Sequence, residues 1–252
     1  MIRTESFSSI NTFKRCPLSY KVRYIDGQRS EPTPQMQRGS NVHREIQQGK
    51  ADTEPTKFAK KFYKKTGKDY RNIADIKQLT ENIAEMKLGI KFDKEELIFC
   101  EFDDDACFYR GKADLVILYY KKKENLSIAV EKIEIIDWKT GTSSGDRKQL
   151  ISYAYMLNKM IGCKDIICKF VYLDKEKISR DIVVTEKELQ DIETWIKSSV
   201  DAIQVETEYP AKFPNWSCNF CPNNEICTNN NKLDDSSGAL TFLNSLLKEK
   251  EE

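Results

Sequence analysis

Four cysteines near the two ends of the chain have the residue type and spacing of a metal centre. Cys16 stands alone near the start, and Cys218, Cys221 and Cys227 follow near the end in a C-x2-C-x5-C pattern. Four thiolates can hold an iron–sulfur cluster or a zinc ion. Four-cysteine zinc sites normally use two C-x2-C pairs, whereas this tail has one. The spacing therefore favours a cluster and leaves zinc as the alternative.

A second group of residues has the chemistry of a divalent-cation site. Asp137-Trp-Lys139 follows a short apolar run, and Asp114 ends the earlier pattern Gly111-Lys-Ala-Asp. A carboxylate and a lysine two residues apart project to the same side of a strand. There the acid can bind a cation, and the lysine can orient or deprotonate an attacking water. Such a pair in isolation is usually a surface ion pair, so its interpretation as a site depends on the other patterns.

Two further patterns complete an ordered series. His43, the only histidine, follows Gly39 by four residues, and Gln149 and Tyr153 form a Q-x-x-x-Y pattern on one helix face. The series resembles the PD-(D/E)XK nuclease superfamily, and more narrowly its RecB-type branch, which includes the CRISPR-adaptation exonucleases and the nuclease domain of AddB. The resemblance spans residues 16–227, nearly the whole chain.

The resemblance implies a role for each of these residues. Lys139 would be the catalytic lysine, acting beside Asp114 and Asp137, and Gln149 and Tyr153 would face the DNA backbone. The ligands of Mg²⁺ or Mn²⁺ would be His43, Asp114, Asp137 and the backbone carbonyl of Trp138. A structural [4Fe–4S] cluster would be held by Cys16, Cys218, Cys221 and Cys227. The implied activity is a metal-dependent DNA exonuclease that hydrolyses phosphodiester bonds of single-stranded or frayed DNA ends.

The pathway and the alternatives remain open at this level. The resemblance is compatible with DNA recombination or repair, phage DNA processing or CRISPR adaptation, with a helicase, recombinase or integrase as partner. One alternative is a non-catalytic DNA-binding or assembly subunit of such a complex, and another is a zinc-stapled endonuclease. Individual residues have simpler interpretations too: His43 as a hydrogen-bonded structural histidine, Tyr153 as core, and Glu101 as a surface charge rather than a group near the metal.

A lysine-rich stripe indicates a second way of binding DNA. Helical spacing places on one face Lys57, Lys60, Lys61, Lys64, Lys65 and Lys68. Lys57, Lys61 and Lys64 are the predicted phosphate contacts. Four aromatic residues that could stack on bases are interleaved with them: Phe58, Phe62, Tyr63 and Tyr70. The alternative is an ordinary amphipathic helix with a solvated basic face and its aromatic residues in the core.

Composition restricts the class of protein. The chain has 252 residues, 32% of them charged, with a net charge of +1, so any basic surface must be local. The first residues contain no apolar stretch of the secretory type, and no apolar run is long enough to span a bilayer. A cytoplasmic protein is expected, with reduced rather than disulfide-bonded cysteines. Four cysteines beside apolar segments are expected to be small buried hydrophobes: Cys100, Cys107, Cys163 and Cys168.

The expected order of helix, three strands, helix and two strands fits an α/β or α+β sandwich. The resemblance implies an α/β fold of the restriction-endonuclease type, with a central mixed sheet flanked by helices. Strands are expected at residues 96–102, 108–120, 133–137, 166–172 and 180–184, with a hairpin turn at 103–105. Helices are expected from residue 6 or 8 toward Cys16, and at 39–48, 56–90, 147–160, 186–205 and 239–247. A single nuclease domain over 1–252 would comprise a helical part at 28–95, a catalytic core at 96–207 and a cluster-binding tail at 208–252.

Overall fold

The computed structural model describes residues 3–28, 30–63, 79–122, 128–141 and 144–212, together with Cys218, Cys221 and Cys227. The chain forms two compact units. The first unit is Met1–Ile10 with Glu31–Glu206, and the second unit is Asn11–Ser30 with Thr207–Glu252. Helix α1, Phe7–Arg15, contributes residues to both units.

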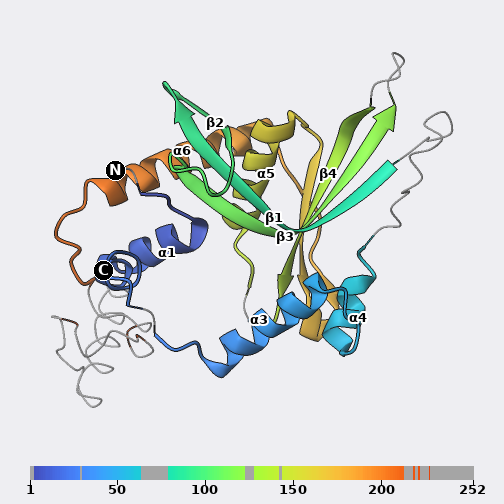
Figure 1. Ribbon diagram of the computed structural model, residues 1–252, viewed down its shortest axis with the longest axis horizontal. Coiled ribbons are helices and arrows are strands. Elements are labelled where there is room, and N and C mark those ends of the chain that lie inside the picture. Colours follow the sequence, from blue (N-terminus) through green and yellow to red (C-terminus); the bar gives the residue numbers. More distant parts are fainter. Residues whose placement is uncertain are drawn as a thin grey trace, which may run out of the picture. The chain divides into compact units, whose positions relative to one another are not determined.

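The first unit is built on a mixed sheet of seven strands among the residues described (Figure 1). The order is β2-β1-β3-β4-β5-β6, and β7 also pairs with β5. All neighbours are antiparallel except β4 and β5. The strands are β1 Leu79–Asp93, β2 Glu96–Cys100, β3 Tyr109–Lys122, β4 Ile128–Lys139, β5 Ile166–Tyr172, β6 Lys177–Ile178 and β7 Ile182–Val183. The predicted fold class, a mixed sheet flanked by helices, is confirmed.

Helix α5, Arg147–Ile161, connects the parallel strands β4 and β5 and packs across β1 to β5. It begins where the Asp146 carboxylate accepts a hydrogen bond from the Lys148 backbone N–H, and it ends at Gly162, whose φ of 75° suits glycine. Helix α6, Glu186–Gln204, starts with a capping box at Thr185 and packs against α5 (Figure 1). Within the described ranges, no helix has the length and apolar character to cross a membrane.

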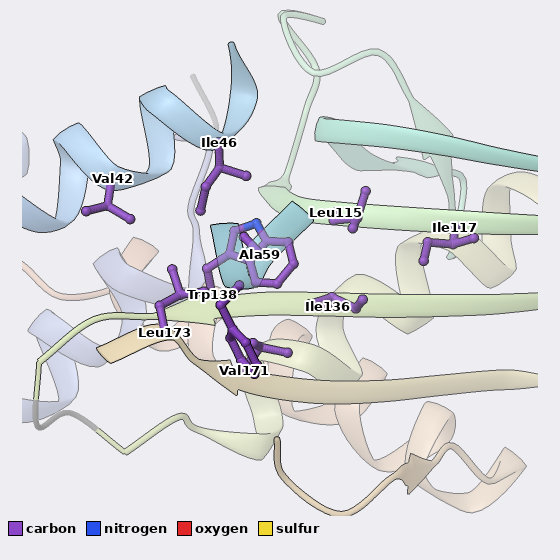
Figure 2. Close-up of a cluster of buried hydrophobic side chains, with 10 residues drawn as sticks. Val42, Ile46, Ala59, Leu115, Ile117, Ile136, Trp138, Val171 and Leu173 are labelled. Atoms are coloured by element: carbon purple, nitrogen blue, oxygen red, sulfur yellow. The ribbon is translucent and has the colours of Figure 1, made fainter. Parts of the chain in front are cut away.

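Two other helices, α3 (Pro34–Gln47) and α4 (Glu54–Lys60), enclose a second layer of the core (Figure 2). Val171 of β5 faces this layer, whereas Cys168, three residues earlier, contacts α5 through the Leu150 carbonyl. Strand alternation therefore puts the two helix pairs on opposite faces. The buried layer consists of Val42, Ile46, Phe58, Ala59, Leu115, Ile117, Ile136, Trp138, Val171 and Leu173.

Three sequence-based expectations are wrong. Residues 79–90, expected to be helical, lie in strand β1. The alternation of Met86, Leu88 and Ile90 fits a strand, and pairing with β3 outweighs the helical preference of the charged residues around them. The turn at 103–105 closes no β2–β3 hairpin, because β1 lies between those strands. Helix α3 begins at Pro34, five residues earlier than expected, where Thr33 provides its cap. The expected helix at 239–247 lies outside the described residues.

The second unit joins residues from both ends of the chain around aromatic rings. Tyr20 of helix α2, Pro17–Tyr20, stacks on Tyr209 with ring centroids 6.1 Å apart, and Phe13 contacts both rings edge-on. The Lys212 ammonium donates to the Lys14 carbonyl. A short π-helix, Lys21–Ile25, follows α2. Segments almost two hundred residues apart in the sequence therefore share this small core.

Substitution of two isoleucines of β4 tests the assignment of the core. Ile136 is fully buried between the sheet and α3 and α4, whereas Ile128 is 43% exposed. Ile136→Ala should lower the free energy of unfolding by about 2–5 kcal/mol, because it leaves a cavity. Ile128→Ala should cost less than about 1 kcal/mol. Urea unfolding of both variants measures the difference, and equal losses would contradict the packing described.

Candidate active site

Three carboxylates lie side by side on neighbouring strands of the sheet. Glu85 of β1 is opposite Asp114 of β3, because the residues on either side of Glu85 pair with those on either side of Asp114. Asp114 is opposite Asp137 of β4, because the adjoining residues Leu115 and Ile136 pair. The sheet register therefore gathers three negative charges that are far apart in the sequence, as predicted for Asp114 and Asp137.

His43 joins this group from helix α3. Its Nδ1 lies 3.2 Å from Asp114 Oδ1, and each of His43, Glu85 and Asp114 offers a ligand atom within 4.8 Å of the others. Burial lowers the pKa of His43, but the hydrogen bond to Asp114 and the charges of Asp114, Asp137 and Glu85 outweigh it and raise the pKa above its ordinary value. One nitrogen and two carboxylate oxygens at this spacing form a donor set suited to a divalent cation.

Asp137 and Lys139 form a buried ion pair beside that donor set. Lys139 Nζ lies 2.6 Å from Asp137 Oδ2, and Asp137 is only 3% exposed. Burial, and next the charge of Asp114, raise the pKa of Asp137 to about 6 even though Lys139 opposes the shift. The Trp138 backbone N–H donates to Asp114 Oδ2 at 2.8 Å. The Asp137-Trp-Lys139 segment thus holds both Asp114 and the catalytic lysine predicted from the sequence.

Gln149 and Tyr153 of α5 extend this arrangement. Lys139 Nζ donates to Gln149 Oε1 at 3.3 Å, and Gln149 Nε2 donates to the Tyr153 hydroxyl at 2.9 Å. Tyr153 is 5% exposed, and its ring lies so close to Gly111 that an added Cβ would be 2.6 Å from it. Gly111 is therefore required by the close approach of Tyr153. The predicted contact of Gln149 and Tyr153 with the DNA backbone stays a prediction.

A polar clasp holds the histidine helix against the end of β4. Arg38 of α3 makes two hydrogen bonds to Asp174, whose Oδ2 also accepts from the Gly141 N–H at 2.6 Å. Asp174 follows β5 in a short 3-10 helix, Leu173–Lys175. A Cβ at Gly39 would lie 2.9 Å from Thr140 Oγ1, so glycine lets α3 approach the strand end one turn before His43. This contact explains the sequence spacing between Gly39 and His43.

The lysine stripe is described only in part. Lys57 pairs with Glu54 at 2.7 Å, and Lys61 lies over the Phe58 ring. Phe58 is buried, and Phe62 packs against Trp138, so these two aromatics belong to the core rather than to a base-stacking surface. Outside the described residues lie Lys64, Lys65, Lys68 and Tyr70. Their predicted role remains a prediction.

The second unit brings Cys16 close to the cysteine-containing tail. The Ser19 hydroxyl lies 3.7 Å from Cys221 Sγ, and the Cys221 N–H donates to the Cys218 carbonyl at 3.0 Å. Burial raises the pKa of Cys16, but hydrogen bonds from the backbone of Lys212 and from Ser19 outweigh burial, so the pKa falls below its ordinary value. The contact between the two chain ends required for a shared centre is therefore present.

The other cysteines behave as expected from the sequence. Each is a free thiol at most 6% exposed. These buried thiols are Cys100, Cys107, Cys163 and Cys168. Burial raises the pKa of Cys100 to about 12, consistent with a neutral packing group. Glu101, in contrast, is exposed, which agrees with its interpretation as a surface charge.

Three residues of the site were missed in the sequence. Glu85 lies in a segment expected to be helical, where the alternation of Met86, Leu88 and Ile90 was the available signal for a strand. Arg38 lies just before the helix expected at 39–48, and Pro34 after Thr33 was the available signal for an earlier helix start. Asp174 belongs to no recognisable pattern, because its partners Arg38 and Gly141 are distant in the sequence.

The mixed sheet, the D-x-K segment at the end of β4 and the facing histidine define a nuclease of the restriction-endonuclease type. The chain belongs to the PD-(D/E)XK nuclease superfamily, whose model matches residues 4–228. Nucleases of this superfamily act on DNA and use divalent metal ions, in agreement with the donor set around Asp114.

Comparison with individual proteins gives less information about this chain than the family match does. No curated protein matches the chain. Among solved structures, the chain is similar to one titled "Crystal structure of SSO0001", with 15% identity over 89% of this chain and 85% of that chain and a TM-score of 0.42.

The clasp leads to a pH-dependent prediction. The hydrogen bond from Arg38, partly opposed by burial, lowers the pKa of Asp174 to about 2. A lowered pKa stabilises the fold above the unfolded value of about 3.9, and this stabilisation is lost as pH falls toward 2. Asp174→Asn should therefore lower the free energy of unfolding by about 1 kcal/mol at neutral pH. Below about pH 4 the difference in this free energy between the variant and wild type should become smaller. Urea unfolding midpoints of both proteins at several pH values measure this difference in stability. A difference that does not depend on pH would contradict the assignment.

Proposed function

We propose that this protein is a Mg²⁺- or Mn²⁺-dependent exonuclease that hydrolyses phosphodiester bonds of single-stranded or frayed DNA ends. The observation that carries the proposal is the convergence of His43, Asp114, Asp137 and Lys139 from one helix and two neighbouring strands. Like-charged carboxylates on neighbouring strands destabilise each other unless a cation compensates them. Loss of activity would remove the selection for such an arrangement.

The residues fit a divalent cation. His43 and Asp114 offer ligand atoms within one ion's reach, and burial, followed by the charge of Asp114, raises the pKa of Asp137 despite its lysine partner. Asp137 and the Trp138 carbonyl would complete the ligand set. A bound Mg²⁺ or Mn²⁺ would polarise the scissile phosphate, activate a water and clamp the reacting oxygens.

The chain's own groups would orient the reactants. Lys139 is held between Asp137 and Gln149, which fixes its ammonium group in a largely buried position. From there it would orient the attacking water or stabilise the charge that develops on the phosphate. The Tyr153 hydroxyl orients Gln149, and the Trp138 N–H fixes one oxygen of Asp114. The exposed Lys57 of α4 and Lys61, which follows the end of α4, would contact phosphates on the way to the site.

The preference for DNA ends, the branch and the pathway rest on the sequence resemblance. The order and spacing of the motifs support a RecB- or AddB-like exonuclease of recombination, repair, phage DNA processing or CRISPR adaptation, working with a helicase, recombinase or integrase. The alternative, a non-catalytic DNA-binding or assembly subunit, is disfavoured because the acids and the lysine are all present and paired.

The proposal includes a structural [4Fe–4S] cluster held by Cys16, Cys218, Cys221 and Cys227. The hydrogen bonds that lower the pKa of Cys16 favour the thiolate, which is the form that binds iron, and Ser19 lies beside Cys221. The cluster would join the two ends of the chain and so close a very long loop, which restricts the unfolded chain. A zinc ion in the same place is the alternative, and an absorbance band at about 400 nm in anaerobically purified protein would indicate the cluster rather than zinc.

Substitutions in the site test the proposed nuclease. Asp114→Ala, Asp137→Ala and Lys139→Ala should each reduce cleavage of end-labelled single-stranded DNA by several orders of magnitude, because each removes a cation ligand or the group that orients the water. Chelation of the metal should do the same. Digestion with Mg²⁺ or Mn²⁺ measures the effect, with thermal melts to verify folding.

Matched controls are exposed residues of the same types. Asp105→Ala, in the turn after β2, and Lys121→Ala, on β3, should keep wild-type cleavage. Wild-type activity in any of the three site variants, in protein free of contaminating nuclease, would refute the proposal. Cleavage only of circular DNA would refute its exonuclease part.

The cluster has a separate test. Cys16→Ala should lose iron and destabilise the second unit as a whole, because Cys16 lies beside the tail it would be joined to. Cys168→Ala, which removes a buried thiol of the first unit, should keep full iron content and cost at most a few kcal/mol. Iron assays and thermal melts decide between them: full iron content in Cys16→Ala would mean that the tail cysteines suffice.

A further inference from the structure

We propose that Glu85 is a ligand of the divalent cation, together with His43 and Asp114. This inference rests on the proposed function and adds a residue that no motif of the sequence identified. It also predicts that strand β1, and not only β3 and β4, contributes directly to the metal site.

The position of Glu85 in the sheet suits a cation ligand. Glu85 is opposite Asp114 in the antiparallel pair β1–β3, so its carboxylate starts from the strand next to that of an expected ligand. Its side chain is 12% exposed, and one of its oxygens lies within 4.8 Å of ligand atoms of both His43 and Asp114. Ligand atoms about 2 Å from a common ion lie up to about 4 Å apart, so small movements of these side chains would bring all three onto one ion. Asp137, although opposite Asp114, is not a member of that close group; its Oδ2 faces Lys139.

The backbone of Glu85 is strained. Glu85 has a φ of 54°, the left-handed region that a non-glycine residue rarely adopts. The other described non-glycine residues with positive φ, Lys94, Glu176 and Tyr209, lie outside strands. Glu85 lies inside β1 with paired residues on both sides. Such strain persists where the surrounding structure imposes it, and it is concentrated at functional sites.

The simpler explanation for Glu85 is its ion pair with Lys112 of β3. Lys112 is half exposed, and an ion pair at such a position stabilises little. That pair accounts for neither the left-handed backbone nor the approach of Glu85 to His43. Tyr63 lies close by: burial, followed by the charges of Glu85 and Asp114, raises the pKa of its hydroxyl. Within the described part of the chain that hydroxyl has no hydrogen-bond partner, so a polar group is held beside these carboxylates.

Binding of Mn²⁺ to DNA-free protein tests the inference. Glu85→Gln keeps the shape of the side chain but removes its charge, and it should weaken Mn²⁺ binding at least about tenfold in calorimetry. Cleavage should then require a correspondingly higher Mn²⁺ concentration. Lys112→Met removes the ion pair and leaves the ligand, so Mn²⁺ should bind as tightly as in wild type or more tightly, because the lysine no longer competes for the carboxylate.

A third variant distinguishes the loss of a ligand from misfolding. Glu85→Gly suits the left-handed backbone, so it should melt at or above the temperature of Glu85→Gln while binding Mn²⁺ equally weakly. The inference is overturned if Glu85→Gln binds Mn²⁺ like wild type, if Lys112→Met is weakened to the same extent, or if wild type does not bind Mn²⁺. These outcomes are separate from the proposed function, which fails if wild type binds Mn²⁺ and leaves DNA intact.

Discussion

Repulsion between carboxylates on neighbouring strands is the constraint on which the rest of the site depends. The register of β1, β3 and β4 places Glu85, Asp114 and Asp137 next to one another, and the antiparallel pairing of these strands prevents them from moving apart. Lys139 and His43 offset part of the charge, but burial and, after it, the charge of Asp114 still raise the pKa of Asp137. A site with this excess of negative charge binds a divalent cation favourably, because folding has already brought the carboxylates together against their repulsion.

Holding the histidine over those carboxylates requires a separate set of contacts. Helix α3 is anchored by Val42 and Ile46 in the buried layer beneath it and by the Arg38–Asp174 clasp at its start. The apolar contacts supply most of the stabilisation, whereas the exposed clasp mainly fixes orientation. Because Asp174 also accepts a hydrogen bond from the N–H of Gly141, the clasp links the histidine helix to the segment that follows Lys139. Packing and polar contacts thus act on the same two elements.

The second unit holds together two segments that are far apart in the sequence. Among its described residues, aromatic contacts join Phe13 and Tyr20 to Tyr209. Small units of this kind commonly depend on a metal centre or a covalent link. The thiol of Cys16, surrounded by hydrogen-bond donors and close to the cysteine-containing tail, stands where such a link is most useful.

The sequence by itself determined the fold class, most strands of the sheet and the residue types of the site, because these depend on local periodicity and on motifs with fixed spacing. It predicted the adjacency of Asp114 and Asp137, since consecutive strands usually pair. It did not determine that β1 separates β2 from β3, nor that Glu85, Arg38 and Asp174 belong near the site. Those features were decided by tertiary structure, because strand register and contacts between distant segments depend on how the whole core packs, and no local pattern encodes them.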